Sequence, residues 1–136
     1  MTPTEEQIVL GQIRKHEGMV LKPYKDPEGH WTIGVGRLLS RGISAQEAII
    51  LAANDIRAAD KELTMNFRWY TDLSGDRKYA WVNLAFNLGV PRLKTFKRAI
   101  AAMERCDYDA AAKEILNSKY ARQVGQRAID IADMIR

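Results

Sequence analysis

The chain lacks the sequence features that are typical of secreted and membrane proteins. Its 136 residues include one cysteine, Cys106, which excludes an internal disulfide. No apolar run is long enough to cross a membrane, and the start Met1–Glu6 lacks the basic and hydrophobic parts of a secretion signal. Internal repeats, linkers and low-complexity stretches are also absent. We therefore expect a soluble protein made in the cytoplasm, which needs another factor to reach any substrate outside it.

The charge balance is mildly basic. The chain has 21 lysine and arginine residues against 17 aspartate and glutamate residues, a formal charge of +4. This excess favours an anionic partner such as a cell envelope, nucleic acid or acidic lipid, and it does not choose among them. A chain of this length is short for two independent cores, so we expect one domain over residues 1–136.

Helix signals dominate the chain. The run Thr4-Glu5-Glu6-Gln7 predicts a capping box for a first helix that ends near Glu17, and Ser44 with Glu47 predicts a second box. Strand signals occur only within residues 19–38. The second box opens a long helix, whose apolar stripe is Ile49, Ala52, Ala53, Ile56, Ala59 and Leu63. The fold class is therefore predicted as α+β, mostly helical, with one small sheet.

Further helices are expected in the C-terminal half. The pattern predicts a helix from Gly75 to Leu88 that stops at Gly89, and it predicts Thr95 and Asp107 as N-caps of two more helices. The expected inward positions are Trp81, Leu84, Ala85 and Leu88 in the first of these, and Ala128, Ile131, Ala132 and Ile135 in a last helix. Trp69, Tyr70 and Leu73 are expected in the core beneath a connecting loop.

Glu17 is a carboxylate at a position where helical spacing predicts core. Ile13 lies one turn before it, and Gly18 follows as a residue that ends a helix in a left-handed turn. Apolar surroundings and the negative end of the helix dipole both disfavour the anion, which suits an acid that donates a proton. The alternative is a solvated surface glutamate at a helix end.

The next residues predict a chain reversal and then a strand. Asp26, Pro27 and Gly29 stand at the preferred positions of a type I turn. The run that follows alternates, with Trp31, Ile33 and Val35 on an expected hydrophobic face and Thr32, Gly34 and Gly36 on a face without bulk. A face without bulk suits close approach by an extended polymer. Taken singly, Asp26 is also typical of a turn former, and the glycines of a bulge or bend.

The arrangement from Glu17 to Gly36 resembles the phage-type lysozymes. The matching segments are Glu17-Gly18, Tyr24-Lys25-Asp26, Glu28-Gly29 and Thr32-Ile33-Gly34-Val35-Gly36, followed more weakly by Asn83-Leu84-Ala85-Phe86-Asn87-Leu88-Gly89 and by Tyr120 with Gln126-Arg127-Ala128. Many relatives have a histidine directly after the last glycine of the strand. This chain has Arg37 there, so an ion pair at that position must be built differently.

The resemblance implies a lysozyme-like fold and a set of site residues. A small β-containing lobe at about 18–44 is joined by a connecting helix at 45–65 to a helical lobe made of 1–17 and 66–136, with the cleft between the lobes. Glu17 is implied as the general acid, Asp26 as the carboxylate across the cleft, and Thr32 as a residue that helps hold the attacking water. Arg127 is implied to pair with Glu17, with Asn83 in support. The implied substrate-binding residues are Glu28, Gly36, Leu38, Phe86 and Asn87.

The implied reaction is hydrolysis of the β-1,4 bond between N-acetylmuramic acid and N-acetylglucosamine in peptidoglycan. One carboxyl group protonates the leaving oxygen while the other activates water. A water held at Thr32 implies inversion, with the carboxyl groups roughly 6.5–9.5 Å apart. We expect no cofactor and no metal, no binding of nucleic acid, and a monomer that acts on the bacterial wall, in the periplasm, after its release from the host cytoplasm.

Other patterns compete with this interpretation. His16, His30 and Cys106 lack the spacing of a zinc site, and Asp107 with Asp109 lacks the glycine and final glutamate of a calcium loop. Asn83, Phe86 and Asn87 are equally typical of helix packing. Two other classes remain: an inactive wall-binding module, which the intact Glu17, Asp26 and Thr32 oppose, and a basic helical DNA-binding protein with a helix-turn-helix from Ser44, which the strand and the scattered basic residues oppose.

Overall fold

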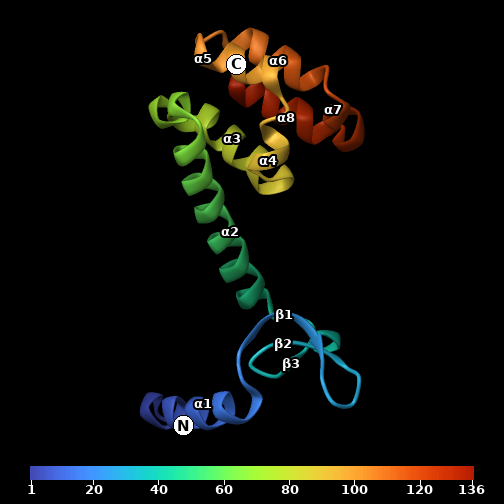
Figure 1. Ribbon diagram of the computed structural model, residues 1–136. Coiled ribbons are helices and arrows are strands. Elements are labelled where there is room, and N and C mark those ends of the chain that lie inside the picture. The colour runs from blue at the N-terminus through green and yellow to red at the C-terminus, as the bar shows by residue number, and fades with distance from the viewer. The chain divides into compact units, whose positions relative to one another are not determined.

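The computed structural model describes residues 1–136. The chain divides into two compact units, Met1–Ala48 and Ile49–Arg136. The predicted fold class is confirmed, because the chain is mostly helical with a single three-stranded antiparallel sheet (Figure 1). None of its helices combines the length and the apolar character that a membrane crossing requires.

The first unit contains one helix, the sheet and a short 3₁₀ turn. The elements are α1 (Pro3–Glu17), β1 (Val20–Lys25), β2 (Trp31–Gly34), β3 (Arg37–Leu38), η1 (Leu39–Arg41) and the start of α2 (Ala45–Asn66). The strands are hydrogen-bonded in chain order, β1-β2-β3, so β2 lies in the middle. No apolar side chain of this unit is buried, and Thr32 is the one buried polar residue of the whole chain.

A capping box opens α1, two residues earlier than the sequence predicted. The Thr2 hydroxyl accepts from the Glu5 N–H at 3.1 Å, and the Glu5 carboxylate accepts from the Thr2 N–H at 2.7 Å. The predicted box at Thr4 is wrong because Pro3, which has a fixed φ and no N–H, fits the first helical position. The predicted end at Glu17 is confirmed. Gly18 follows with φ 73°, and its N–H donates to the Arg14 carbonyl at 2.8 Å.

Strand β2 ends earlier than the alternating pattern predicted. Gly34 and Gly36 have φ values of 71° and 67°, and Val35 and Gly36 form the turn that leads into β3. The predicted hydrophobic face is also wrong, because Trp31 is 53% exposed while Thr32 is 3% exposed. A short three-stranded sheet buries one face of its central strand, and here that face is the one that carries Thr32.

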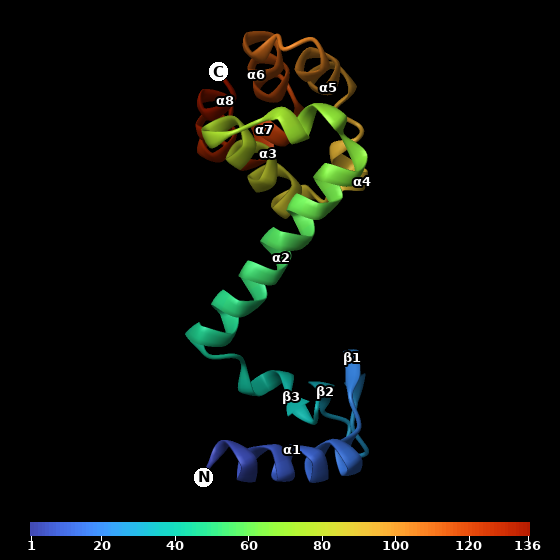
Figure 2. The same cartoon turned by 90° about the vertical axis from the view of Figure 1, so that its left-hand side faces the viewer.

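The second unit is entirely helical. After the remainder of α2 it contains η2 (Arg68–Asp72), α3 (Gly75–Leu88), α4 (Val90–Leu93), α5 (Lys97–Glu104), α6 (Tyr108–Leu116), α7 (Lys119–Val124) and α8 (Gln126–Ile135). Helix α8 packs against α3 and α6, and α6 packs against α5 (Figure 2). The predicted helix Gly75–Leu88 is confirmed at both ends, as is the box at Ser44, which opens α2.

The two predicted N-caps downstream have different outcomes. Asp107 caps α6, since its carboxylate accepts from the Ala110 N–H at 3.1 Å. Thr95 does not cap α5, because its hydroxyl donates to the Arg92 carbonyl at 2.6 Å in the turn that closes α4. Phe96 is the N-cap residue and makes no side-chain capping bond. Helices α4 and α7 were not predicted, since each is too short for an apolar period to show.

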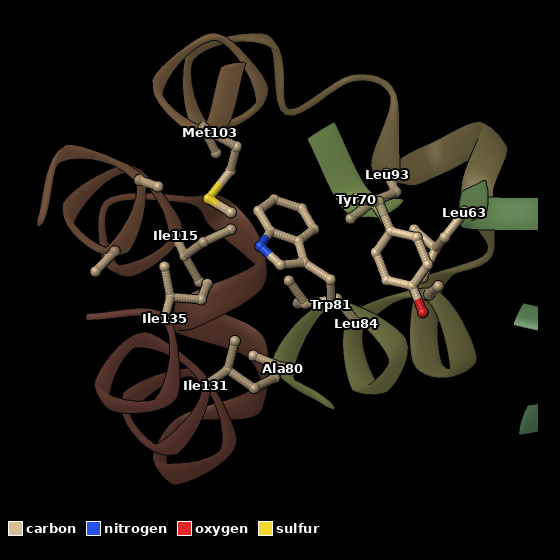
Figure 3. Close-up of a cluster of buried hydrophobic side chains, with 14 of the residues drawn as sticks. Leu63, Tyr70, Ala80, Trp81, Leu84, Leu93, Met103, Ile115, Ile131 and Ile135 are labelled. Carbon is tan, nitrogen blue, oxygen red and sulfur yellow. The ribbon is translucent and has the colours of Figure 1, made fainter. Parts of the chain in front are cut away.

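Trp81 of α3 lies at the centre of the core of the second unit (Figure 3). The Trp69 ring meets it edge-on at a centroid distance of 4.8 Å, and Phe67 packs against Trp69 at 5.1 Å. All four predicted core positions of α8 are buried, but only Ala59 and Leu63 of the predicted α2 stripe are. Alanine is the commonest buried residue, at positions 59, 80, 85, 99, 102, 111, 112, 128 and 132.

A matched pair of substitutions on α8 tests this core. Ile131 is 1% exposed and Ile129, two residues earlier on the same helix, is 46% exposed. Ile131→Ala should lower the free energy of unfolding by about 2–5 kcal/mol, since it removes buried methyl groups and leaves a cavity. Ile129→Ala should change it by no more than about 0.5 kcal/mol. Urea unfolding of both variants measures the difference, and equal losses would contradict the packing of α8.

Candidate active site

Glu17 ends α1, and its carboxyl group lies directly against Gly36. A Cβ added at Gly36 would stand 2.9 Å from Glu17 Oε2 and 3.0 Å from Glu17 Cδ and Cγ. Real side chains essentially never approach so closely, so the absence of a side chain at Gly36 is what leaves room for the Glu17 carboxyl group. The sequence predicted that an apolar stripe would shield the Glu17 side chain from water. Within the first unit that side chain is exposed.

Asp26 is fixed by the turn that it begins. Its Oδ1 accepts from the backbone N–H groups of Glu28 and His30 at 2.9 and 2.8 Å, and the Gly29 N–H donates to its carbonyl at 2.9 Å, as the predicted reversal requires. Oδ2 lies 3.7 Å from His30 Nδ1. The carboxyl group is 25% exposed. It is therefore oriented by two main-chain donors through Oδ1, while Oδ2 accepts no hydrogen bond from the protein.

Thr32 is held by the backbone of His30, the residue whose N–H also orients the Asp26 carboxylate. Its hydroxyl donates to the His30 carbonyl at 3.0 Å, and that carbonyl also accepts from the Asp26 N–H at 2.9 Å. With its one proton committed, the Thr32 hydroxyl has only acceptor capacity left. The backbone of His30 thus connects both groups, a role that sequence reasoning missed because a backbone contact across a turn leaves no signal in the residue type.

Arg37 forms an ion pair within the first unit. Its Nη2 lies 2.9 Å from Glu47 Oε2 and its Nη1 donates to Glu47 Oε1 at 3.2 Å. Glu47 Oε1 also accepts from the Ser44 N–H at 3.0 Å, as part of the capping box of α2. The Ser44 backbone N–H and the Arg37 guanidinium together lower the pKa of Glu47 from 4.5 to about 2. One carboxylate thus joins β3 to the start of α2.

Three of the predicted site residues come together in the second unit. The Asn83 amide oxygen accepts from Arg127 Nε at 3.0 Å and from Nη2 at 2.8 Å, so α3 and α8 are joined by a forked hydrogen bond. Both residues and Phe86 line a cavity of about 620 Å³, whose other walls include Ile56 and Val82. Phe86 is 45% exposed.

The remaining predicted residues lie on the surface. Glu28, Leu38 and Asn87 are exposed, and no hydrogen bond fixes the side chain of Asn87. No group of three or more histidine, cysteine, aspartate or glutamate side chains is placed to hold a metal ion. The first unit therefore contains the Glu17 carboxyl group beside Gly36, and the Asp26 carboxylate connected through the His30 backbone to the buried Thr32 hydroxyl. These are the groups that acid and base catalysis require.

Comparison with known proteins agrees with this chemistry. The family model for phage lysozyme matches residues 14–130. The chain is 28% identical to "Probable T4-type lysozyme 1" of Dictyostelium discoideum over 93% of this chain and 92% of that protein. It is 28% identical to an endolysin of Acyrthosiphon pisum secondary endosymbiont phage 1, with coverage of 91% and 84%. It is 25% identical to the pre-baseplate central spike protein Gp5 of Enterobacteria phage T4, over 90% of this chain and 26% of that protein.

The fold, the site and these matches define a glycoside hydrolase of the lysozyme class. More narrowly, the chain belongs to the phage lysozyme family, whose model spans most of its length. The resemblance inferred from residues 17–36 is thereby confirmed.

The Arg37–Glu47 pair should make stability depend on pH. Because the folded pKa of Glu47 is lowered, its contribution is fully present above about pH 4.5 and is lost as the pH falls toward 2. Glu47→Gln should lower the melting temperature at pH 6 and flatten the decline between pH 4.5 and pH 2. Glu62→Gln, an exposed change on the same helix, is the control. If the two variants show the same pH dependence, the pair does not stabilise the fold.

Gly36 should matter to activity through its contact with Glu17. Gly34 has a similar φ of 71° but open space where a Cβ would stand. Alanine at either position should cost about 1–2 kcal/mol of stability, because each φ is positive. Only Gly36→Ala displaces the Glu17 carboxyl group, and a shift of about 1 Å costs on the order of 100-fold in rate. Turnover on purified wall at a temperature where both variants are folded separates them, and equal turnover would refute the positioning role.

Proposed function

We propose that this chain is a muramidase that cleaves the β-1,4 bond between N-acetylmuramic acid and N-acetylglucosamine, with inversion at the sugar carbon. The observation that carries the proposal is the backbone of His30, whose N–H donates to the Asp26 carboxylate and whose carbonyl accepts from the Thr32 hydroxyl. An inverting enzyme needs a carboxylate that takes a proton from water and a partner that orients that water.

The residue roles follow from what each group has left to offer. Thr32 accepts a hydrogen bond from the water, and Asp26 Oδ2 accepts the proton that the water loses. Both contacts use hydrogens of the water, so its lone pair is free to attack the sugar carbon. Glu17 donates a proton to the leaving oxygen, and Gly36 leaves it room to do so. Inversion requires the two carboxyl groups to be roughly 6.5–9.5 Å apart, which leaves space for the water.

The role of the second unit in this reaction is part of the same proposal. Arg127 pairs with Glu17 and stabilises its carboxylate after the proton has left. Asn83 fixes the Arg127 guanidinium, and the two hydrogen bonds that its amide oxygen accepts from Arg127 support this role. Phe86 and Asn87 are exposed on α3, where a ring can stack on a sugar and an amide can bond its hydroxyls. Glu28 and Leu38 contact the substrate from the first unit.

The biological setting completes the proposal. The chain acts as a monomer on bacterial peptidoglycan, without a metal or cofactor and without nucleic acid, after another factor has released it from the host cytoplasm to the wall. The name endolysin of one relative supports a role at the wall. The division into a β-containing lobe at 18–44, a connecting helix at 45–65 and a helical lobe of 1–17 and 66–136 stays a prediction.

Glu17→Gln tests the assignment of the acid. The amide has nearly the shape of the carboxyl group but cannot donate a proton at neutral pH, so turnover on purified peptidoglycan should fall by about 100-fold to 10,000-fold. Glu6→Gln makes the same change on an exposed residue of the same helix and should leave turnover unchanged. More than a few per cent of wild-type activity in folded Glu17→Gln would refute the role.

Asp26→Asn separates the base from the turn former. The asparagine oxygen still accepts the two backbone N–H bonds, so the fold should persist, but the neutral amide takes no proton from water. We expect a loss of at least about 100-fold in turnover with little change in melting temperature. Asp55→Asn, an exposed change on α2, is the control. Wild-type turnover in Asp26→Asn would leave the residue as a turn former only.

A further inference from the structure

Two segments of the second unit together carry six cations. They are Arg92, Lys94, Lys97, Arg98, Lys119 and Arg122, all of them exposed and called here the basic patch. They belong to two segments without any acidic residue, 90–103 and 115–129. These six of the 21 basic residues leave 15 against the 17 acidic ones, so the patch accounts for the positive excess of the chain.

Three contacts bring the two segments together. Arg92 Nη2 donates to Gln123 Oε1 at 3.2 Å, which joins α4 to α7. Phe96 packs against Tyr120 with ring centroids 6.2 Å apart. Lys97 and Arg98 line a cavity of about 410 Å³ together with Asn117 and Ser118, the residues just before Lys119. The two segments that carry the six cations are therefore neighbours.

No acidic side chain neutralises this patch. None of its six cations lies within 4.0 Å of a carboxylate, whereas the ion pairs of the chain involve Arg37, Arg105, Arg136 and His30. Glu114, which is half-buried, lies at the wall of the cavity beside Lys97 and Arg98 and forms no ion pair with them. Six like charges repel one another when free, so an anionic partner that lies across them gains attraction and relieves that repulsion.

The surroundings of the patch favour one kind of partner. No large apolar side chain is exposed between Phe86 and Ile129, so the patch has no anchor for insertion into a bilayer. Its aromatic residues, Phe96 and Tyr120, pack against each other and offer no exposed ring on which bases can stack. A hydrated chain with regularly spaced anions needs neither feature.

We propose that the basic patch binds a phosphodiester polymer attached to the bacterial wall, and so holds the enzyme near its substrate. The choice of a wall polymer rests on the proposed function, because peptidoglycan cleavage is what brings the chain to the envelope. Arginine and lysine both bind phosphate oxygens, and an extended polymer lets several phosphates engage the patch at once.

Binding of the full chain to purified wall tests the proposal. Glu17→Gln serves as the parent so that the wall is not degraded during the measurement. Lys97→Glu with Lys119→Glu should weaken binding of this parent at low salt about tenfold or more. Lys22→Glu with Lys61→Glu changes two exposed and unpaired lysines elsewhere and gives the same net charge. This control should weaken binding less than about twofold. Extraction of the phosphodiester polymer from the wall should weaken parent binding to the level of the patch variant.

Three outcomes would overturn the proposal: equal losses in the two variants, parent binding that extraction leaves unchanged, or duplex DNA bound through the same lysines as tightly as the wall polymer. If the charge-reversed variant unfolds, Lys94→Gln with Arg122→Gln replaces it, because this change removes two positive charges without adding negative ones. Unchanged wall binding in that variant would also overturn the proposal. Hydrolysis by the wild-type chain is measured separately. Patch binding without hydrolysis would reject the proposed function alone, and hydrolysis without patch binding would reject the patch alone.

Discussion

The first unit depends on polar interactions between side chains and the backbone and on one ion pair, because it has no buried apolar side chain to hold it together. The turn at Asp26, the capping boxes at Thr2 and Ser44, and the Arg37–Glu47 pair each fix a backbone reversal or a helix start. Every group proposed to take part in catalysis in this unit is attached to one of these reversals or lies beside one. The precision of the site therefore comes from polar groups that satisfy one another, and a substitution there alters geometry before it alters packing.

The second unit is stabilised in a different way. Its helices share one core around Trp81, and its polar contacts mostly join elements at the surface, as between Arg127 and Asn83. The second unit thus owes its stability to packing, whereas the catalytic groups are proposed at a turn and a helix end of the first unit. The difference also separates the experiments, since core truncations report on unfolding whereas changes near Gly36 report on turnover.

Sequence alone predicted the fold class and several helix ends, because apolar periodicity and capping residues act over a few neighbouring positions. The helix Gly75–Leu88 and the box at Ser44 are examples. It failed at the start of α1, where Thr2 and Thr4 were both possible N-caps and Pro3 favours Thr2. It also failed at Thr95, whose hydroxyl bonds the Arg92 carbonyl instead of capping α5. Two contacts were not predictable: that of Gly36 with Glu17, and that of the His30 carbonyl with Asp26 and Thr32. Both depend on the exact backbone dihedral angles of a turn, and the residue types in a turn limit those angles without determining them. The catalytic assignments came from the resemblance and stay predictions.

The abundance of alanine in the helical core limits how this unit can diverge. Where an alanine is fully buried, as at 80, 102, 111, 112 and 132, helices meet with no space for a longer side chain. A larger residue there forces the helices apart, at about 1–3 kcal/mol for each overpacked site. Homologues that enlarge one such position must shrink a facing residue in compensation. We therefore expect covariation between facing small and large residues, more than conservation of single positions, among relatives that share about a quarter of their residues with this chain.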